Sequence, residues 1–274
     1  MPRIALFQSR TGVDPVDNAR ALGDAVEEAA AGGAAMLFTP EMSNLLDRDR
    51  TRAAMEIVGQ AEDRVVAAVS EAARRHGLWV HLGSVAVDVG DGKWANRSML
   101  IDAEGRTRST YDKIHLFDVD VGEADRWRES AVYRAGGEAV LAEDTPVGSM
   151  GLTICYDLRF PALFARLAEA GAQVVAVPAA FTVPTGRAHW EILLRARAIE
   201  AGVFVVAAAQ EGLHADGRRT YGHSLVVDPW GEVLLDMGEG TGVGFVDIDL
   251  QRIAEVRSRI PALDHRRAIG PIRR

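Results

Sequence analysis

The residue of this sequence best suited to covalent chemistry is its single cysteine, Cys155. It follows the apolar run 152–154, which predicts a buried strand, and precedes a polar turn and Pro161, which suits the first position of a helix. Open α/β sheets place their chemistry at the carboxyl ends of strands. The alternative is a small buried core residue, but the polar turn 156–160 argues against it.

Two charged residues occupy comparable positions elsewhere, because Glu41 follows an apolar run and Lys113 follows a predicted hairpin. A cysteine nucleophile reacts as the thiolate, so it needs a base that takes its proton or a cation that stabilises its charge. Partial burial is expected to raise the pKa of Glu41, which suits a base near neutral pH. The Lys113 ammonium is expected to lower the pKa of the thiol and to hold an oxyanion. Taken singly, each charge is more simply explained as a solvated strand end.

The elements that must position these residues are strand–helix units mixed with hairpins. The segment 152–177 has the pattern strand–helix–strand, so a parallel strand pair with a right-handed crossover is expected. Residues 114–138 are predicted to be a loop at the mouth of a site, and 181–188 a turn. Helices are predicted at 16–31, 61–75, 161–170, 189–201 and 250–259, and strands at 4–7, 35–38, 78–87, 94–101, 107–111, 152–154, 174–177, 203–208, 224–227, 233–235 and 244–248.

The whole chain of 274 residues is expected to form one α/β domain, 1–274, because no linker-like break interrupts it. Two sheets covered outside by helices and one doubly wound sheet both fit the pattern. A net charge of −8 and a pI near 5.4 disfavour nucleic acid and anionic membranes as partners. A single cysteine and a start without a signal-peptide pattern predict a cytoplasmic protein.

Three stretches together resemble the nitrilase, or carbon–nitrogen hydrolase, superfamily. They are FTPEMSN around Glu41, YDKIHLFD around Lys113 and GLTICYDLRFP around Cys155, in the family's order and spacing. The resemblance covers nearly the whole chain and implies a four-layer αββα sandwich of two mixed sheets. It implies a catalytic triad with Glu41 as general base and acid, Lys113 as cationic stabiliser and Cys155 as nucleophile. It also implies a second glutamate, for which Glu129 in RESAVY is the first choice and Glu138 in AGGEAV the second.

The reaction implied by the resemblance is hydrolysis of a terminal amide to an acid and ammonia through a thioester on Cys155. Lys113 and the backbone N–H of Tyr156 would hold the oxyanion, without any metal or organic cofactor. Seven histidines without ligand spacing agree with the expectation of no metal site. The resemblance also implies a homodimer, or a larger homo-oligomer, paired through the face that carries the helix after the cysteine. The tail 260–274 would reach onto the partner subunit.

Four further stretches, AAFTVPTGRAHWEILLRARAIE, VVAAAQ, TYGHS and VDPWGEV, most resemble the branch that hydrolyses deaminated glutathione. The neighbouring ω-amidase branch, which acts on α-ketoglutaramate, shares the cysteine turn and the HWE helix. Both substrates carry carboxylates, so an arginine is expected in the pocket. Arg159 is the first candidate and Arg187 the second, with a structural ion pair of Arg159 as the alternative. The other residues predicted to bind substrate are Tyr156, Phe181, Thr182 and His189.

Three more distant alternatives share the same features. An N-carbamoyl amino acid hydrolase and a true nitrilase would both use the same triad. A catalytically silent binding protein would keep the fold without turnover, although the presence of all three triad residue types disfavours it. The expected partner in every enzymatic case is a small amide or nitrile.

Overall fold

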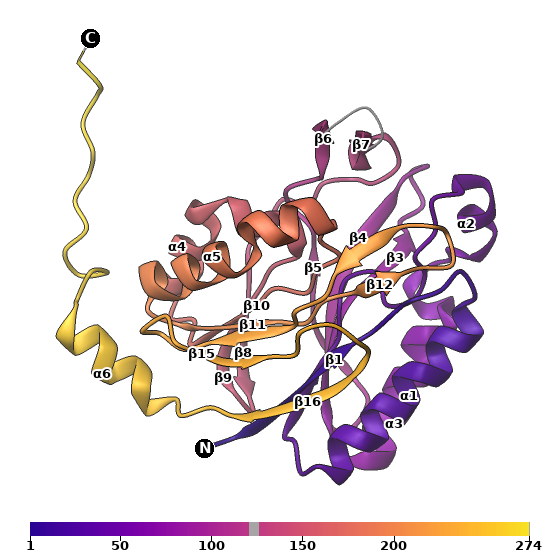
Figure 1. The fold of residues 1–274 in the computed structure, drawn as a ribbon, viewed down its shortest axis with the longest axis horizontal. Coiled ribbons are helices and arrows are strands. Elements are labelled where there is room, and N and C mark those ends of the chain that lie inside the picture. Colours follow the sequence, from indigo (N-terminus) through magenta and orange to yellow (C-terminus); the bar gives the residue numbers. More distant parts are fainter. Residues whose placement is uncertain (121–125, 274) are drawn as a thin grey trace.

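Two six-stranded sheets form the centre of the molecule (Figure 1). The structure, a computed structural model, describes residues 1–120 and 126–273. The first sheet has the strand order β16 (Gly242–Asp247), β1 (Arg3–Gln8), β2 (Met36–Phe38), β3 (Trp79–Asp88), β4 (Trp94–Ile101) and β5 (Thr107–Asp112). The second has the order β15 (Val233–Asp236), β14 (Leu225–Val227), β11 (Phe204–Ala207), β10 (Val174–Ala176), β9 (Gly148–Leu152) and β8 (Val140–Thr145). Both sheets mix parallel and antiparallel pairs.

Two small hairpins, the helices and three 3₁₀ turns make up the other elements of the described residues. Two small hairpins pair β6 (Asp118–Asp120) with β7 (Arg126–Arg128), and β12 (Glu211–Leu213) with β13 (Arg219–Tyr221). The helices are α1 (Pro15–Ala31), α2 (Arg50–Glu56), α3 (Arg64–His76), α4 (Pro161–Glu169), α5 (Val183–Ala201) and α6 (Gln251–Arg259), with single 3₁₀ turns η1 (Gln60–Glu62), η2 (Glu129–Ala131) and η3 (Cys155–Arg159).

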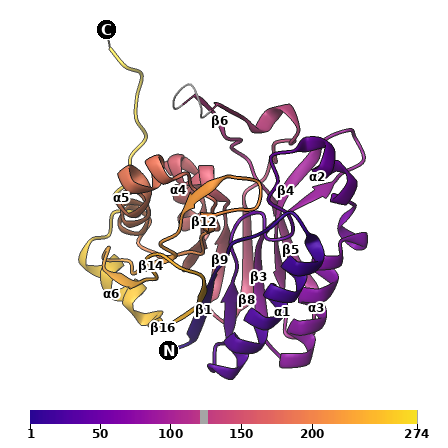
Figure 2. The same cartoon turned by 45° about the vertical axis from the view of Figure 1, so that its right-hand side comes forward.

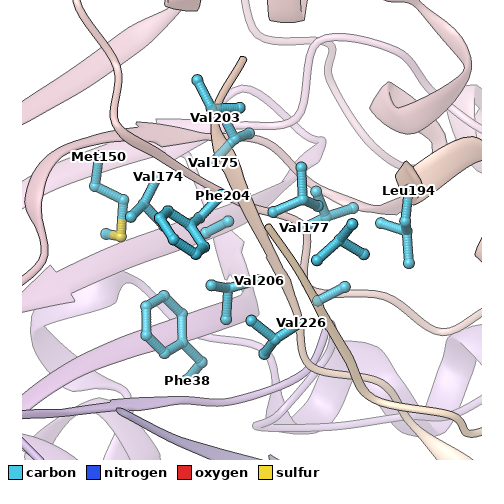
Figure 3. Close-up of a cluster of buried hydrophobic side chains, with 14 of the residues drawn as sticks. Phe38, Met150, Val174, Val175, Val177, Leu194, Val203, Phe204, Val206 and Val226 are labelled. Atoms are coloured by element: carbon cyan, nitrogen blue, oxygen red, sulfur yellow. The ribbon is translucent and has the colours of Figure 1, made fainter. Parts of the chain in front are cut away.

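The alternation of side chains along each strand divides the core into two layers of contacts. In β1, Ile4 and Leu6 face the core between the two sheets, whereas Ala5 faces the helices on the outside. Figure 3 shows Phe38 of β2 beside Phe204 and Val206 of β11, so the first sheet packs face to face on the second. Each buried side chain of this size contributes about 1.5–3 kcal/mol to folding.

Helices cover the outer face of each sheet. Helices α1 and α3 pack on the first sheet through one apolar stripe each, and both begin at an aspartate cap, Asp14 and Asp63. Helices α4 and α5 lie on the opposite side of the molecule, over the second sheet (Figure 2). The resulting order of layers is α–β–β–α. The predicted fold class is therefore confirmed, and the alternative of one doubly wound sheet is wrong.

Several element boundaries differ from the predictions. The parallel pairing of β9 with β10 is as expected. The predicted turn 181–188 is wrong, because α5 begins at Val183 with Pro184 in its first turn, where a missing N–H costs nothing. The short helix α2 and the strand β8 were not predicted. The segment 114–138 contains the hairpin β6–β7 and the turn η2, and its residues 121–125 lie outside the described part.

Beyond α6 the chain first stays on the body of the molecule, where Leu263 packs against the core, and its last described residues then extend away from it (Figure 1). Ile269 and Ile272 of this segment are 95% and 88% exposed. Arg266 contacts Glu169 at the end of α4.

Throughout the described residues, no helix combines the length and apolar character needed to span a membrane.

Candidate active site

Glu41 follows β2 of the first sheet and is almost completely buried. Its Oε1 accepts hydrogen bonds from Nζ of Lys113 and Nδ2 of Asn96, both at 2.9 Å. Its Oε2 accepts from the backbone N–H of Ala180, also at 2.9 Å. Since Ala180 follows β10 of the second sheet, the carboxylate is held from both sheets at once.

A glycine in β3 allows the Glu41 turn to approach this closely. A Cβ atom on Gly83 would lie 1.8 Å from the carbonyl oxygen of Thr39 and 2.6 Å from Cβ of Pro178. Only a residue without a side chain at this position of β3 therefore leaves room for Thr39, which precedes Glu41, and for Pro178, which precedes Ala180.

Lys113 comes directly after β5 and is 1% exposed. Besides Glu41, its ammonium donates to both carboxylate oxygens of Glu129, at 3.2 and 3.0 Å. Glu129 is held in turn by the backbone N–H of Phe117 at 2.6 Å. The second choice from the sequence, Glu138, is an exposed residue.

Asn96 on β4 joins the two glutamates, and the sequence reasoning missed it. Its Nδ2 donates to Oε1 of Glu41 and to Oε1 of Glu129, at 2.9 and 3.1 Å. Its backbone carbonyl accepts from the N–H of Lys113, so strand pairing places Asn96 beside the lysine. An asparagine within a strand carries no periodic signal, and only the register of β4 against β5 identifies it.

Cys155 follows β9 of the second sheet, which ends at Leu152, and it is the first residue of η3. Its φ of +50° lies in the left-handed region, which costs a residue with a Cβ about 1–3 kcal/mol. The buried Asp157 holds this turn, because its carboxylate accepts from the N–H of Ile154 at 2.8 Å and from the Tyr111 hydroxyl at 2.6 Å. The backbone N–H of Cys155 donates to the carbonyl of Pro178 at 2.9 Å.

The structure corrects two expectations, a raised pKa for Glu41 and a lowered pKa for the Cys155 thiol. Burial raises the pKa of Glu41, but the charge of Lys113 and hydrogen bonds from Lys113, Cys155 and Asn96 outweigh burial, so this pKa is lowered. Burial raises the pKa of the Cys155 thiol well above its usual value, and the charge of Glu41 adds to this effect while Lys113 only partly opposes it. Burial lowers the pKa of Lys113, but Glu129 and Glu41 raise it well above its usual value. The resting site therefore holds a carboxylate, an ammonium and a protonated thiol.

A cavity of about 340 Å³ opens onto these residues. Glu41, Lys113, Glu129 and Cys155 line it, as do three of the predicted substrate-binding residues: Tyr156, Phe181 and Thr182. Apolar side chains from the α2 region and β4 form much of the remaining wall, among them Leu45, Ala53, Ile57 and Trp94.

The arginines predicted from the sequence do not reach this cavity. Of the residues that the structure describes, Arg159, Arg187 and His189 are absent from its lining. The guanidinium carbon of Arg159 lies 5.6 Å from the ring centroid of Phe181, and its Nη2 is 3.3 Å from Nδ1 of His189. Arg187 is exposed. The arginines that do line the cavity are Arg48, Arg50, Arg128 and Arg218.

No group of three or more His, Cys, Asp or Glu side chains within residues 1–120 and 126–273 is arranged to hold a metal ion. The alternative considered for Arg159, a structural ion pair with Asp157 or a glutamate, is not found at Asp157. Asp157 instead accepts from His115 Nδ1 at 2.7 Å.

Comparisons with known proteins identify the family of this chain. Residues 3–258 match the family model described as carbon–nitrogen hydrolase. The deaminated glutathione amidase of Yersinia enterocolitica is 38% identical over 98% of this chain and 94% of its own length. The fusion protein NitFhit of Caenorhabditis elegans is 39% identical, and this chain spans 60% of that protein.

Solved structures lead to the same family. The crystal structure of C. elegans NitFhit superimposes with a TM-score of 0.90 at 39% identity, covering 97% of this chain and 65% of that one. A mutant of the amidase from Nesterenkonia sp. AN1, with a TM-score of 0.79, 26% identity and coverage of 95% and 98%, carries acrylamide added to its active-site cysteine. This chain belongs to the carbon–nitrogen hydrolase family and is a hydrolase of the amidase type.

Proposed function

We propose that this protein hydrolyses deaminated glutathione, with Cys155 as nucleophile, Glu41 as general base and acid, and Lys113 as the cation that stabilises the oxyanion. The observation that carries the proposal is the buried Glu41–Lys113 pair beside the thiol, at the wall of a cavity large enough for a small substrate. Relatives 37–38% identical that are named deaminated glutathione amidase support the choice of substrate.

The charge states of the site define the first step. The thiol of Cys155 is protonated at rest, so the proton must pass to Glu41 as the sulfur attacks the amide carbonyl. The C–S bond forms while the electron pair of the carbonyl π bond moves to oxygen. Lys113 and the backbone N–H of Tyr156, the residue after Cys155 in η3, stabilise this oxyanion.

The second half of the reaction reuses Glu41. The tetrahedral intermediate collapses, the C–N bond breaks, and the departing amine takes the proton from Glu41, which leaves a thioester on Cys155. Glu41 then removes a proton from water as the water oxygen attacks the thioester. The sulfur leaves with that proton, and the free acid is released.

In the proposed reaction the bond that breaks belongs to the amide that both candidate substrates share. Deaminated glutathione and α-ketoglutaramate are both amides of the distal carboxyl of 2-oxoglutarate. The departing amine is cysteinylglycine in the first case and ammonia in the second. The ammonia expected from the sequence thus applies only to α-ketoglutaramate, and 2-oxoglutarate is the product that reports on both reactions.

A substrate panel tests this function. Release of 2-oxoglutarate or ammonia is measured with deaminated glutathione, α-ketoglutaramate, an N-carbamoyl amino acid and a simple nitrile. Deaminated glutathione is expected to give the highest kcat/KM. A much higher kcat/KM for α-ketoglutaramate would instead identify an ω-amidase. No turnover, together with no acyl adduct on Cys155 by mass spectrometry, would identify a catalytically silent binding protein.

The assembly and location form part of the same proposal. The whole chain acts as one cytoplasmic domain, in which a single cysteine leaves no internal disulfide to maintain. Two copies pair through the face of α4 and α5, and the tail 260–274 lies across the partner. The exposed Ile192 and Ile199 of α5 and the exposed Ile269 of the tail support this pairing, because large apolar side chains favour burial.

A further inference from the structure

Two arginines and a tryptophan meet at one wall of the cavity. The guanidinium carbon of Arg218 lies 4.8 Å from the ring centroid of Trp127, and that of Arg48 lies 5.3 Å from it. Arg48 lies between β2 and α2, Trp127 is in β7, and Arg218 is in the turn between β12 and β13. All three residues line the same cavity as Cys155 and Glu41. Segments far apart in the sequence therefore bring two positive charges to one aromatic ring.

Two buried N–H groups of this cluster lack a partner. Among the described residues, neither Nε of Arg218 nor Nε1 of Trp127 has a hydrogen-bond acceptor. The Arg218 side chain is only 16% exposed, and its nearest carboxylate, Asp216, lies 3.4 Å from Nη2. Both atoms are closed off from solvent, and buried donors without acceptors cost about 1–3 kcal/mol each, so an acceptor that reached them would stabilise the cluster.

The position of Arg218 is fixed by its hairpin. The carboxylate of Asp216 accepts from the backbone N–H of Arg218 at 2.9 Å and closes the turn. Buried His214 contacts Oγ1 of Thr220 within the hairpin, at 2.7 Å, and the carbonyl of Thr11 in the body of the molecule, at 3.0 Å. A guanidinium held in this way loses little conformational entropy when it binds an anion.

Nearby carboxylates satisfy only part of the cluster, because Asp216 pairs with Nη2 of Arg218 at 3.4 Å. Asp47, which also lines the cavity, is held by Nε and Nη2 of Arg52 at 2.6 and 2.7 Å. Burial lowers the pKa of Arg218, and the charge of Arg48 lowers it further against the opposing effect of Asp216. Two cations that repel each other in a cavity are stabilised by an added anion.

We propose that Arg218, Arg48 and Nε1 of Trp127 form the subsite that binds a carboxylate of the amide substrate. This inference rests on the proposed function and replaces Arg159, which lies outside the cavity. A guanidinium presents paired N–H donors that match the two oxygens of a carboxylate. The carboxylate has two possible sources: the 2-oxo acid on the acyl side of the substrate, or the glycine end of its departing amine.

Three substrates separate these sources, measured with wild type and Arg218→Met. Deaminated glutathione carries both carboxylates, its glycine amide carries only the acyl-side carboxylate, and α-ketoglutaramate carries only the acyl-side carboxylate on a smaller molecule. A 10- to 100-fold loss of kcat/KM, mainly through KM, is expected for Arg218→Met. Loss with all three substrates assigns the subsite to the acyl side, and loss with deaminated glutathione alone assigns it to the departing amine.

Matched variants control the experiment. Arg219→Met removes an exposed arginine next to Arg218 and is expected to keep wild-type kcat/KM. Trp127→Phe keeps an aromatic ring but removes the indole N–H, so a loss of about 5-fold is expected. Arg159→Met tests the rival arginine. Unchanged kinetics for Arg218→Met with every substrate, or a larger loss for Arg159→Met, would overturn the inference.

A direct binding measurement keeps this inference separate from the proposed function. If the wild type hydrolyses none of the substrates, the proposed function fails. The subsite is then tested by calorimetric titration of wild type and Arg218→Met with 2-oxoglutarate and with cysteinylglycine. Binding of either compound to wild type that weakens at least 10-fold in Arg218→Met supports the subsite, whereas no binding to wild type, or equal binding to both proteins, refutes it.

Discussion

Replacing Lys113 by methionine should destabilise the protein and should do so in a pH-dependent way. Methionine keeps most of the volume of the side chain but removes the ammonium that lies 2.9 Å from Glu41 and 3.0 Å from Glu129. The two carboxylates would then share only the amide of Asn96. Because Glu41 is almost completely buried, water cannot replace the lost charge.

The expected magnitude follows from this burial. Charges 2.9 Å apart attract by roughly 6 kcal/mol at an effective dielectric constant of about 20, before the cost of desolvation is subtracted. Breaking a buried ion pair by removing one partner costs about 3–5 kcal/mol, because the other charge stays buried. The free energy of unfolding of Lys113→Met should fall by that amount at pH 8.

Lowering the pH should reduce the difference in free energy of unfolding between wild type and Lys113→Met. In wild type the pKa of Glu41 is lowered from 4.5 and that of Lys113 is raised above 10.5, so the pair stabilises the fold fully between those values. In Lys113→Met burial is the main remaining influence, and it raises the pKa of Glu41 above that of the unfolded chain. The folded variant then binds a proton that the unfolded chain does not, and its stability rises by up to about 1.4 kcal/mol per unit as the pH falls from 8 toward 5.

Urea unfolding at several pH values between 5 and 8 measures both effects. The only other lysine of the chain, Lys93, is exposed, and Lys93→Met is the matched control with an expected change within about 0.5 kcal/mol. In the double variant Glu41→Gln/Lys113→Met a neutral amide replaces the carboxylate that has lost its ammonium partner. This variant should regain about half of the lost free energy of unfolding at pH 8. A Lys113→Met variant as stable as wild type at pH 8, or a gap that does not change with pH, would refute this account of the site.

Further predictions concern the nucleophile Cys155, the base Glu41, the close contact at Gly83 and the C-terminal tail. Cys155→Ala should abolish turnover of any amide while circular dichroism shows an intact fold, and Cys155→Ser should be nearly as inactive because a hydroxyl is far less acidic than a thiol. Glu41→Gln should lose hydrolysis yet react faster with iodoacetamide at pH 8, because the Glu41 charge raises the pKa of the thiol. Equal alkylation rates would contradict that electrostatic assignment. Gly83→Ala should cost about 1–3 kcal/mol in thermal unfolding and reduce kcat, because its Cβ would overlap the Thr39 carbonyl. Removal of residues 261–274 should leave a folded chain that light scattering reports as a monomer; an unchanged dimer would exclude the tail from the interface.

The sequence allowed much of the fold to be predicted, because long amphipathic helices and apolar strands carry a strong periodic signal. The position of α1 and the parallel pair β9–β10 are examples. The start of α5 was misread because proline and glycine at 184 and 186 are typical of turns, yet both are tolerated in the first turn of a helix. Strand β8, with charged residues in its second half, lacks the alternation that would have identified it.

The site itself was less predictable than its residues. Glu41, Lys113 and Glu129 could be named from short stretches around them, but the pKa directions depend on which charges end up nearest to each group. Burial alone predicts a raised pKa for Glu41; the contact with Lys113 reverses it. The arginines of the cavity were missed for a related reason. Arg48 and Arg218 lie in loops that meet only through the packing of the two sheets, and nothing in the sequence near Arg218 indicates Trp127 as its neighbour.

The charges around Cys155 explain why a buried thiol with a raised pKa suits this reaction. At rest the carboxylates of Glu41 and Glu129 and the ammonium of Lys113 sum to one negative charge. When the thiol proton passes to Glu41 and the sulfur attacks, the negative charge moves from Glu41 to the oxyanion, and the sum stays the same. Both positions adjoin Lys113 in the proposed mechanism, so no charge is separated over a long distance in a poorly solvated cavity. A thiolate formed in advance would lower the barrier less, because Lys113 would already be stabilising the ground state.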